Sequence, residues 1–235
     1  MTAPIEASDP LVVESFPLAG VSGSHVSLTV HAHQVVSFIA DAITGVNGLA
    51  PRALGLEQSA NGRVLIFGQD VQMLSRRAAL AFRRQVGYVP ADDGLLQNLS
   101  LADNVALPLR FGSSLSPREI DGRLRIMLAA VRLREGAATL RPADADEEQR
   151  RRASLARALA FDPDLVIMDH PFDGLGSRAA SEVLEIARGG ETAEGARRAV
   201  FITGQDLPDR LRSRIDVRHR IVRGELQTEP EPDSK

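Results

Sequence analysis

Several residue types that carry much of protein chemistry are absent or nearly absent from this chain. Its 235 residues include no cysteine, no tryptophan, one tyrosine and one lysine, Lys235, which is the last residue. The absence of cysteine excludes disulfide bonds and thiolate metal sites, and it fits a reducing cytoplasm. Because every other basic residue is an arginine or a histidine, no site in the body of the chain can use a lysine ammonium group.

Long hydrophobic runs and a strong charge imbalance are missing as well. No apolar run approaches the roughly 18 residues of a membrane-spanning helix and no signal peptide opens the chain, so we expect any membrane role to be exerted through a partner. A net charge of −3 gives no general attraction to nucleic acid or anionic lipid. With 43% hydrophobic residues, the chain is long enough for one large domain or a domain with a subdomain.

Strand-like and helix-like segments alternate along the chain, which favours an α/β fold. The predicted strands are 11–16, 25–30, 35–40, 85–90, 165–168, 199–203 and a last pair around 217–226. The predicted helices are 75–84, 101–135 with a Gly-Ser break at 112–114, 177–188 and 208–212. We expect one domain over 11–227, with a helical subdomain at about 92–160, between disordered tails at 1–10 and 228–235.

The predicted helical subdomain contains two specific local signals. Ser116 followed by Pro117 is typical of a helix start, with a serine N-cap and proline in the first turn. Apolar residues then recur at the i, i+3, i+4 and i+7 spacing of one helix face. These residues are Leu124, Met127, Leu128 and Val131. We interpret them as a packing face.

In the stretch 140–176, a helix, a turn, a strand and an aspartate follow one another in a specific order. An Arg-rich helix is followed by a turn at Asp162-Pro163, a buried strand at Leu165–Met168 and then Asp169. The sequence RRASLARALAFDPDLVIMDHPFDGL closely resembles the ATP-binding subunit of ABC transporters, and VGYVPADDGLLQNLSLADNVALPLR resembles the glutamine-loop region of that family. The resemblance covers roughly residues 11–226. It implies a P-loop NTPase (ABC ATPase) fold with an N-terminal antiparallel β lobe and an inserted α-helical lobe.

The predicted phosphate loop lacks most of the residues that its chemistry needs. Such a loop needs glycines for close backbone approach, a lysine on the β- and γ-phosphates and a Ser or Thr hydroxyl on Mg²⁺. The resemblance places Ala40, Ile43 and Gly45 at the glycine positions, Val46 at the lysine and Asn47-Gly48 at the Ser/Thr pair. Losing the lysine alone would weaken nucleotide binding by roughly tenfold to a hundredfold. Gly45, Asn47 and Gly48 are therefore a vestigial cofactor site, and an ordinary strand-to-helix loop is the alternative.

The positions that act on Mg²⁺ and water are also changed. The resemblance places Asp169 at the Mg²⁺ aspartate, as a vestigial metal ligand, and His170 at the glutamate that polarises the attacking water. Ala91 replaces the glutamine of the glutamine loop, and Gly204 replaces the γ-phosphate-sensing histidine. An imidazole can accept a proton near neutral pH, so a catalytic role of His170 is the minor alternative. Together with Val46, these positions predict that hydrolysis is lost.

The segment that matches the LSGGQ signature of the family is acidic. Ala145–Gln149, with the sequence ADEEQ, puts negative charge where the family holds a γ-phosphate at a helix N-terminus. Acidic residues in a first turn do favour the helix dipole, so we expect the helix to be kept while phosphate is repelled.

Arg150–Arg152 could form a basic nucleic-acid patch, but a salt-bridged, solvated face is the favoured interpretation. Phe16 is the candidate for adenine stacking, with a place in the core as the favoured alternative.

The losses occur together, while the structural segments between them match the family. This pattern favours a non-hydrolysing structural or regulatory subunit of a membrane ABC transport complex, and the PFDGL and NVALPLR segments look most like Mla/MCE-type lipid transporter ATPases. The resemblance implies ATP and Mg²⁺ as family cofactors, here bound weakly or not at all. It also implies an integral membrane permease and a second nucleotide-binding subunit, like or unlike this one, as partners. The location implied is cytoplasmic, on the inner face of the cell membrane.

Two other functions stay open at this point. The chain could be the weakly ATP-binding half of an asymmetric ABC ATPase heterodimer that retains ATP-driven transport. It could also be a scaffold protein no longer tied to transport. Neither alternative involves nucleic acid.

Overall fold

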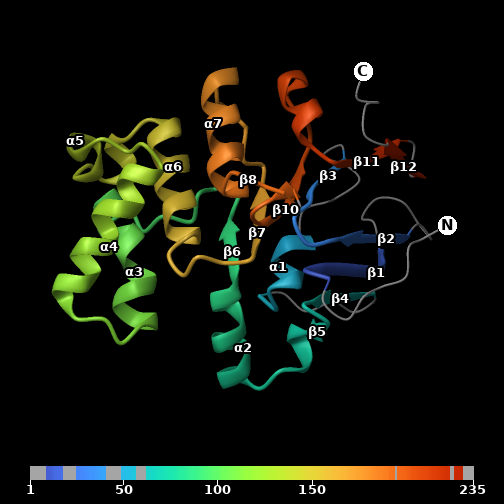
Figure 1. Ribbon diagram of the computed structural model, residues 1–235, viewed down its shortest axis with the longest axis horizontal. Helices are drawn as coiled ribbons and strands as arrows, with labels where there is room; N and C mark the ends of the chain where they lie inside the picture. The colour runs from blue at the N-terminus through green and yellow to red at the C-terminus, as the bar shows by residue number, and fades with distance from the viewer. Residues whose placement is uncertain are drawn as a thin grey trace.

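The structure is a computed structural model that describes residues 9–17, 25–40, 49–56, 62–193, 195–222 and 225–229. Figure 1 shows two sheets on the side of the molecule where both termini lie, and a group of helices, α3 to α6, on the other side. Within the described residues, no helix is long and apolar enough to cross a membrane.

A six-stranded sheet with the order β12-β11-β3-β10-β7-β6 lies at the centre. Its strands are β3 (Val35–Ile39), β6 (Val86–Val89), β7 (Leu165–Asp169), β10 (Ala199–Gly204), β11 (Val217–Val222) and β12 (Glu225–Glu229). All neighbours pair in parallel except β11 and β12, which are antiparallel. β3 and β10 are buried along their whole length, as expected of central strands covered on both faces. The strands predicted at 35–40, 85–90, 165–168 and 199–203 are confirmed, and the structure shows that they pair in parallel.

A second, four-stranded sheet of order β2-β1-β4-β5 forms the antiparallel β lobe that the sequence predicts. Its strands are β1 (Leu11–Pro17), β2 (His25–Val30), β4 (Arg63–Ile66) and β5 (Gln69–Asp70). The register of β1 against β2 shifts between Val13 and Phe16, where Ser15 has a φ of 49°. Such a bulge bends the strand and increases its twist.

The helices follow the predicted pattern with two differences. A short helix, α5, lies at the end of the predicted 101–135 region, and the predicted helix at 208–212 falls at a 3₁₀ turn. They are α1 (Leu49–Ala53), α2 (Arg76–Phe82), α3 (Leu101–Gly112), α4 (Pro117–Ala130), α5 (Glu135–Ala138), α6 (Glu147–Ala158) and α7 (Ser177–Arg188). The 3₁₀ turns are η1 (Val71–Met73), η2 (Arg83–Gln85), η3 (Pro142–Asp144) and η4 (Asp209–Arg214), and a small hairpin pairs β8 (Glu191–Thr192) with β9 (Gly195–Ala196). The predicted N-cap at Ser116 is confirmed, because its side chain accepts the Glu119 N–H in a capping box.

Both ends of the described chain are ordered beyond the predicted domain limits. Asp9, assigned to the N-terminal tail from the sequence, is 5% exposed and lies 2.8 Å from Nδ1 of His31. At the other end, Thr228 and Glu229 continue β12 by pairing with β11. In each place, a partner that is distant in sequence orders residues whose own composition is typical of a tail.

The central sheet separates two hydrophobic cores. Val36 and Phe38 of β3 face a core shared with the antiparallel sheet, α1 and α2. Val35 and Ile39 face the other core, which α3, α6 and α7 cover. The predicted packing face of α4 is confirmed: Val131 is fully buried in this second core, and the three other residues pack against it. They are Leu124, Met127 and Leu128.

A buried asparagine holds the loop that enters the helical lobe. Asn104 is 0% exposed, and its amide donates to the Leu96 and Ser100 carbonyl oxygens, each at 3.0 Å. Its Oδ1 accepts the Leu96 N–H at 2.7 Å. Three hydrogen bonds from one side chain therefore close residues 96–104 into a fixed turn.

We expect Asn104→Ala to lower the free energy of unfolding by about 2–4 kcal/mol, because the three hydrogen bonds made by a fully buried side chain are lost. Urea denaturation followed by circular dichroism measures this change. Asn98, exposed in the same loop, is the matched control, and Asn98→Ala should stay within about 0.5 kcal/mol of the unmodified protein. Equal effects of the two substitutions would contradict the assignment.

Candidate functional site

The predicted metal ligand lies at the carboxyl edge of the central sheet. Asp169 is the last residue of β7, beside Thr203 of the parallel strand β10. The Thr203 hydroxyl, 1% exposed, donates to Asp169 Oδ1 at 2.7 Å. This bond fixes the carboxylate at the place where ligands bind in open α/β sheets. The sequence-based placement of Asp169 at a strand end is confirmed, whereas its role as a metal ligand stays a prediction.

His170 follows at a sharp change of chain direction. It has a φ of 50°, unusual for a residue with a side chain, and its N–H donates to the Thr203 carbonyl at 2.8 Å. Its ring is 10% exposed, and Nδ1 lies 3.0 Å from Oδ2 of Asp173. A neutral imidazole that donates from Nδ1 to a carboxylate has Nε2 as an acceptor. In that tautomer, Nε2 of His170 is left as a hydrogen-bond acceptor.

Gly204 ends β10 beside the start of the predicted phosphate loop. The Gly204 carbonyl accepts the Ala40 N–H at 3.0 Å, so the ends of β10 and β3 meet. A Cβ at Gly204 would have no neighbour closer than 3.7 Å, so packing does not require a glycine here. The vestigial cofactor residues Gly45, Asn47 and Gly48, as well as Ile43 and Val46, lie outside the described residues.

Ala91 lies in a loop whose backbone is held tightly although its side chain is exposed. Arg151 of α6 donates to the Pro90 and Ala91 carbonyl oxygens at 3.1 and 3.3 Å. Arg157 and Ser154, also on α6, both donate to the Asp93 carbonyl at 2.9 Å. The loop therefore keeps a fixed path, and the Ala91 methyl group offers no hydrogen bond.

The expected solvated face at Arg150–Arg152 is wrong in one respect. Arg151 and Arg152 are 2% and 5% exposed, and both point into the protein. They are buried because each guanidinium group finds carbonyl and carboxylate partners on neighbouring segments, which offsets the cost of desolvation. The salt-bridged part of the prediction holds, because Arg151 lies 3.1 Å from Asp93. Burial raises the pKa of the Asp93 carboxyl group, although the positive charges of Arg151 and Arg150 act in the opposite direction.

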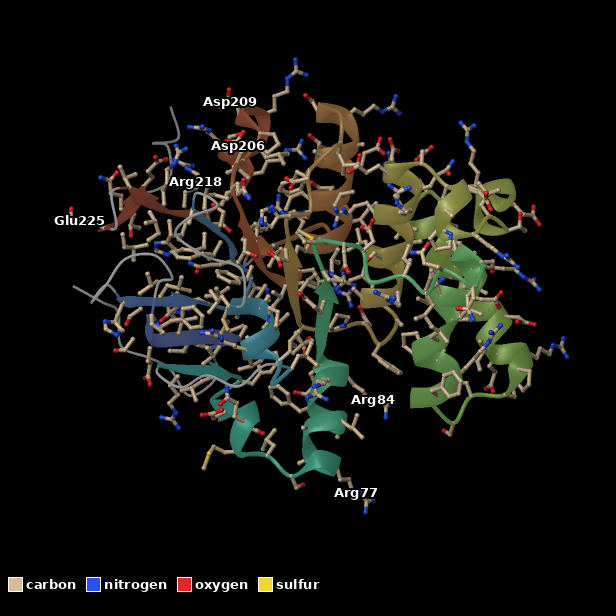
Figure 2. All side chains as sticks on the ribbon, turned by 180° about the vertical axis from the view of Figure 1, so that it is seen from behind. Arg77, Arg84, Asp206, Asp209, Arg218 and Glu225 are labelled. Carbon is tan, nitrogen blue, oxygen red and sulfur yellow. The ribbon has the colours of Figure 1, made fainter. Side chains whose placement is uncertain are left out.

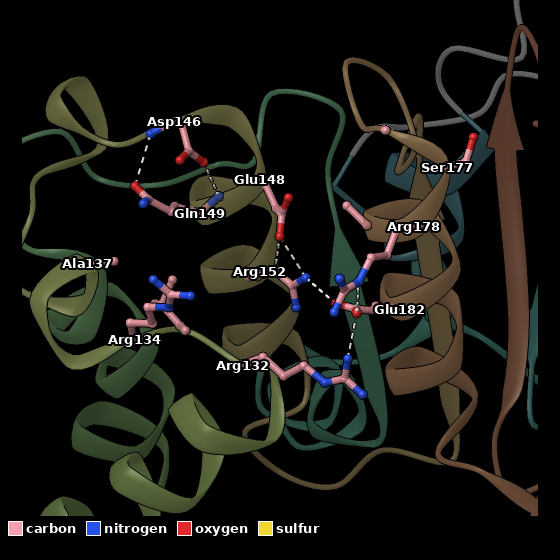
Figure 3. A pocket seen from close by; sticks show the side chains of 13 residues that line it. Arg132, Arg134, Ala137, Asp146, Glu148, Gln149, Arg152, Ser177, Arg178 and Glu182 are labelled. Carbon is pink, nitrogen blue, oxygen red and sulfur yellow. Dashed lines mark hydrogen bonds and ion pairs between the residues drawn. The ribbon is translucent and has the colours of Figure 1, made fainter.

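The acidic signature segment satisfies its own helix end. Asp146 is the N-cap of α6, and its Oδ1 accepts the Gln149 N–H at 2.8 Å while Gln149 Oε1 accepts the Asp146 N–H at 3.1 Å. Figure 3 shows this reciprocal pair. Two N–H groups at the helix start are thus already bonded, and the carboxylate already opposes the positive end of the helix dipole.

The two glutamates of the segment also contact this chain. The Glu147 carboxylate lies against Gly174, in the turn between β7 and α7. Glu148 accepts from Arg152 Nε at 2.8 Å. The predicted signature region is therefore occupied by intramolecular contacts of the acidic side chains.

Phe16 lies in the core and not at an open surface. It is 3% exposed within the core shared by the antiparallel sheet and α1. The Arg52 guanidinium group lies over the ring, 5.1 Å from its centroid. The ring is packed as the core alternative predicts, so adenine stacking has no structural support.

A hollow of about 710 Å³ opens between the helical lobe and α7. Figure 3 shows four arginines reaching into it from the turn after α4, from α6 and from α7. Its charged lining residues are Arg132, Arg134, Arg152, Arg178, Asp146, Glu148 and Glu182. Sequence reasoning missed Glu182 because its partners lie as far as 50 positions away and no local pattern marks the residue. Among the described residues, no group of three or more His, Cys, Asp and Glu side chains could hold a metal ion.

A parallel sheet with an antiparallel β lobe, an inserted helical lobe and an aspartate at the carboxyl edge defines an ATP-binding cassette. The family model described as "ABC transporter" matches residues 24–173, more than half of the sequence, so the chain belongs to the ABC transporter family. Solved cassettes confirm the fold at low identity. MJ0796, a bacterial ABC transporter cassette, superimposes with a TM-score of 0.81 at 20% identity, over 95% of this chain and 100% of that chain. The cbiO1 protein of Clostridium perfringens superimposes with a TM-score of 0.74 at 19% identity, over 95% of this chain and 89% of that chain.

Curated relatives belong to two kinds of transport system. The methionine import ATP-binding protein MetN 2 of Pseudomonas aeruginosa (strain UCBPP-PA14) is 32% identical over 159 residues, covering 68% of this chain and 47% of the relative. The intermembrane phospholipid transport system ATP-binding protein MlaF of Haemophilus influenzae is 38% identical over 138 residues, covering 57% and 52%. The chain thus spans about half the length of the curated relatives it matches.

We expect Gly174→Ala to destabilise the protein by about 1–3 kcal/mol, because its φ of 71° strains a residue with a Cβ and the new methyl group would collide with the Glu147 carboxylate. Thermal unfolding measures the loss. Adding Glu147→Ala should recover the part due to the collision but not the part due to φ.

Gly176 is the matched control for this substitution. It has a φ of −64°, caps α7 without a side-chain hydrogen bond, and leaves open space around a new Cβ. Gly176→Ser should therefore leave the melting temperature unchanged or raise it, because a serine can cap the helix. An unaltered melting temperature in Gly174→Ala would contradict both the backbone strain and the collision with Glu147.

Proposed function

We propose that this chain is a nucleotide-binding-domain-like subunit of a membrane ABC transport complex that has lost ATP hydrolysis. The observation that carries the proposal is the state of the α6 N-terminus. Two of its N–H groups, those of Asp146 and Gln149, already have side-chain acceptors, and the Glu147 and Glu148 carboxylates stand in the same turn. A phosphate approaching this helix end would meet three carboxylates and a helix dipole that they already oppose.

The composition of the other half of the predicted site supports the same conclusion. Val46 stands at the predicted lysine position, and the chain has no lysine before residue 235 to replace it. An arginine is a poor substitute, because its planar fork does not fit where a compact ammonium group binds between phosphates. Ala91 and Gly204, at the predicted glutamine and histidine positions, offer no side-chain hydrogen bond. ATP and Mg²⁺ would therefore bind weakly or not at all.

One observation favours the second candidate, a weakly ATP-binding half of an asymmetric heterodimer. Asp169 is held in place at the sheet edge, and the His170 ring, paired with Asp173, lies in the next position. A partner with an intact signature helix would then complete one site in the pair. Against this, the acidic α6 end would not complete the partner's own site. A scaffold that has left transport is the third candidate.

The permease partner fits a surface beside α2 and the end of α3. Phe111 is 85% exposed and Leu80 is 57% exposed. Between these elements, Arg84 covers the Phe161 ring at 4.6 Å from its centroid, and Figure 2 shows Arg84 and Arg77 projecting from this end of the molecule. Exposed large apolar side chains next to cations are typical of a protein-binding surface. The chain would then act from the cytoplasmic side, through the permease.

The cargo is proposed on the relatives alone. MlaF belongs to a phospholipid transport system and MetN to a methionine importer. We favour a lipid (MCE-type) complex, because the NVALPLR and PFDGL segments look most like Mla-type ATPases. We also propose that this chain pairs with a second nucleotide-binding subunit, like or unlike itself. We do not propose nucleic acid as a partner, because Arg151 and Arg152 point inward.

Equilibrium binding of a fluorescent ATP analogue with Mg²⁺ tests the loss of the site. We expect no saturation in the low micromolar range, and no change on Asp169→Asn. Val46→Lys should strengthen binding by roughly tenfold to a hundredfold at most, because it restores one charge-assisted contact only. Low-micromolar binding that needs Mg²⁺ and is lost in Asp169→Asn would overturn the proposal in favour of the heterodimer half.

Co-purification from the native membrane tests the transport partner. We expect an integral membrane protein to be captured with the intact chain, and Phe111→Asp to reduce its recovery at least fivefold, because a charge would be buried at the contact. Ile126→Asp, which changes another exposed aliphatic residue of the helical lobe at 71% exposure, is the control and should retain the partner. Capture of no membrane protein would favour the scaffold.

A further inference from the structure

Glu182 of α7 binds three arginines from three separate segments. Its Oε2 lies 2.6 Å from Arg152 Nη2, and its Oε1 lies 2.6 Å from Arg132 Nη1 and 3.1 Å from Arg178 Nε. Figure 3 shows these groups converging at the floor of the hollow between the helical lobe and α7. Arg178 is on the same helix, whereas Arg132 and Arg152 are not. One carboxylate thus holds the α4–α5 turn and α6 to α7.

Arg152 extends the same connection to the backbone of the helical lobe. Its Nη1 donates to the Val131 carbonyl at 2.8 Å, and its Nε donates to Glu148 at 2.8 Å. The side chains of Arg152 and Glu182 are 6% and 16% exposed. Charge-assisted bonds that are shielded from water and from salt are stronger than exposed ion pairs. Removing one member also leaves a buried charge without its partner.

These contacts cross from one lobe of the molecule to the other. Val131 is the C-cap of α4, the second long helix of the helical lobe, and Arg132 follows it in the turn to α5. Glu182 lies on α7, and the apolar face of α7 packs against the central sheet in the same core as β10. The helical lobe and α7 share the second hydrophobic core, and the hollow opens beside that core. The Glu182 carboxylate therefore adds charged contacts between the lobes where the apolar packing ends.

We propose that Glu182 is an electrostatic latch that fixes the orientation of the helical lobe relative to the central sheet. The orientation is then set by contacts within this chain, whether or not a nucleotide is present. The inference goes beyond the loss of hydrolysis, because it concerns how the chain presents its helical lobe to a partner. It also holds if the weakly ATP-binding alternative is correct, since no residue of the latch belongs to the sheet-edge site around Asp169.

Glu185 provides a matched control on the same helix. It is 47% exposed and pairs with Arg214 of η4 at 3.0 Å, so this ion pair does not involve the helical lobe. Glu182→Gln and Glu185→Gln therefore make the same chemical change one helical turn apart. Only the first removes a charge that joins the lobes.

Distances between two spin labels measure the lobe orientation directly. Because the chain has no cysteine, Ser114→Cys in the helical lobe and Gln72→Cys beside the antiparallel sheet, both exposed, give a unique pair of labelling sites. In the otherwise unchanged protein we expect one narrow distance distribution, unaltered by ATP and Mg²⁺. Glu182→Gln should broaden or shift it, and Glu185→Gln should not. A folded Glu182→Gln protein with an unchanged distribution would overturn the latch.

Hydrogen exchange supplies a second, independent measurement. The Val131, Arg132 and Leu133 N–H groups bond within the end of α4, at Met127, Ala129 and Leu128, and we expect them to exchange roughly tenfold faster or more in Glu182→Gln than in Glu185→Gln. If Glu182→Gln fails to fold, Arg132→Gln is the milder variant, because Arg132 is 61% exposed and its loss leaves Arg152 and Arg178 paired. It should produce a smaller change in both measurements, and the absence of any change there would also contradict the proposal.

Discussion

The structure depends on arginine side chains along α6, of which Arg151 and Arg152 are buried and Arg157 is half-buried. Arg151 donates to the Pro90 carbonyl in the loop after β6, and Arg157 donates to the Asp93 carbonyl in the same loop. Arg152 binds the Val131 carbonyl at the end of α4 and the Glu182 carboxylate of α7. A buried ion pair is not in itself strongly stabilising, because desolvation offsets much of the attraction between the charges. What these groups contribute is geometry. Arginine has five donors in a rigid fork, so one side chain can fix several backbone segments at once.

The same helix explains how a cassette fold persists with an acidic signature segment. A helix N-terminus needs acceptors for its N–H groups and tolerates negative charge well. Asp146 and Gln149 meet that need within the chain, so the helix no longer depends on glycine and serine at these positions. The stability of the helix and the recognition of phosphate require opposite charges at this place. Under the proposed function, the acidic residues keep the helix and disfavour phosphate.

At the sheet edge, the proposed loss of hydrolysis would leave the frame of the fold intact. Thr203 fixes Asp169, and the Gly204 carbonyl joins β10 to β3 by backbone hydrogen bonds that do not depend on side chains. Backbone pairing tolerates substitution at Ala91, His170 and Gly204, because these residues support the fold through their main chain. The fold and the hydrolytic chemistry thus rest on different atoms, which allows one to remain without the other.

The sequence by itself determined the class of fold, the order of strands and helices, the place of Asp169 at a strand end and the packing face of α4. Those features follow from hydrophobic periodicity and from local capping, which neighbouring residues decide. Tertiary structure alone decided that Arg151 and Arg152 point inward, that Asn104 closes a loop, that Asp9 is ordered by His31, and that Glu182 joins two lobes. Each of these depends on a partner brought close only when the chain folds, and long polar side chains give no periodic signal of the partner they will find.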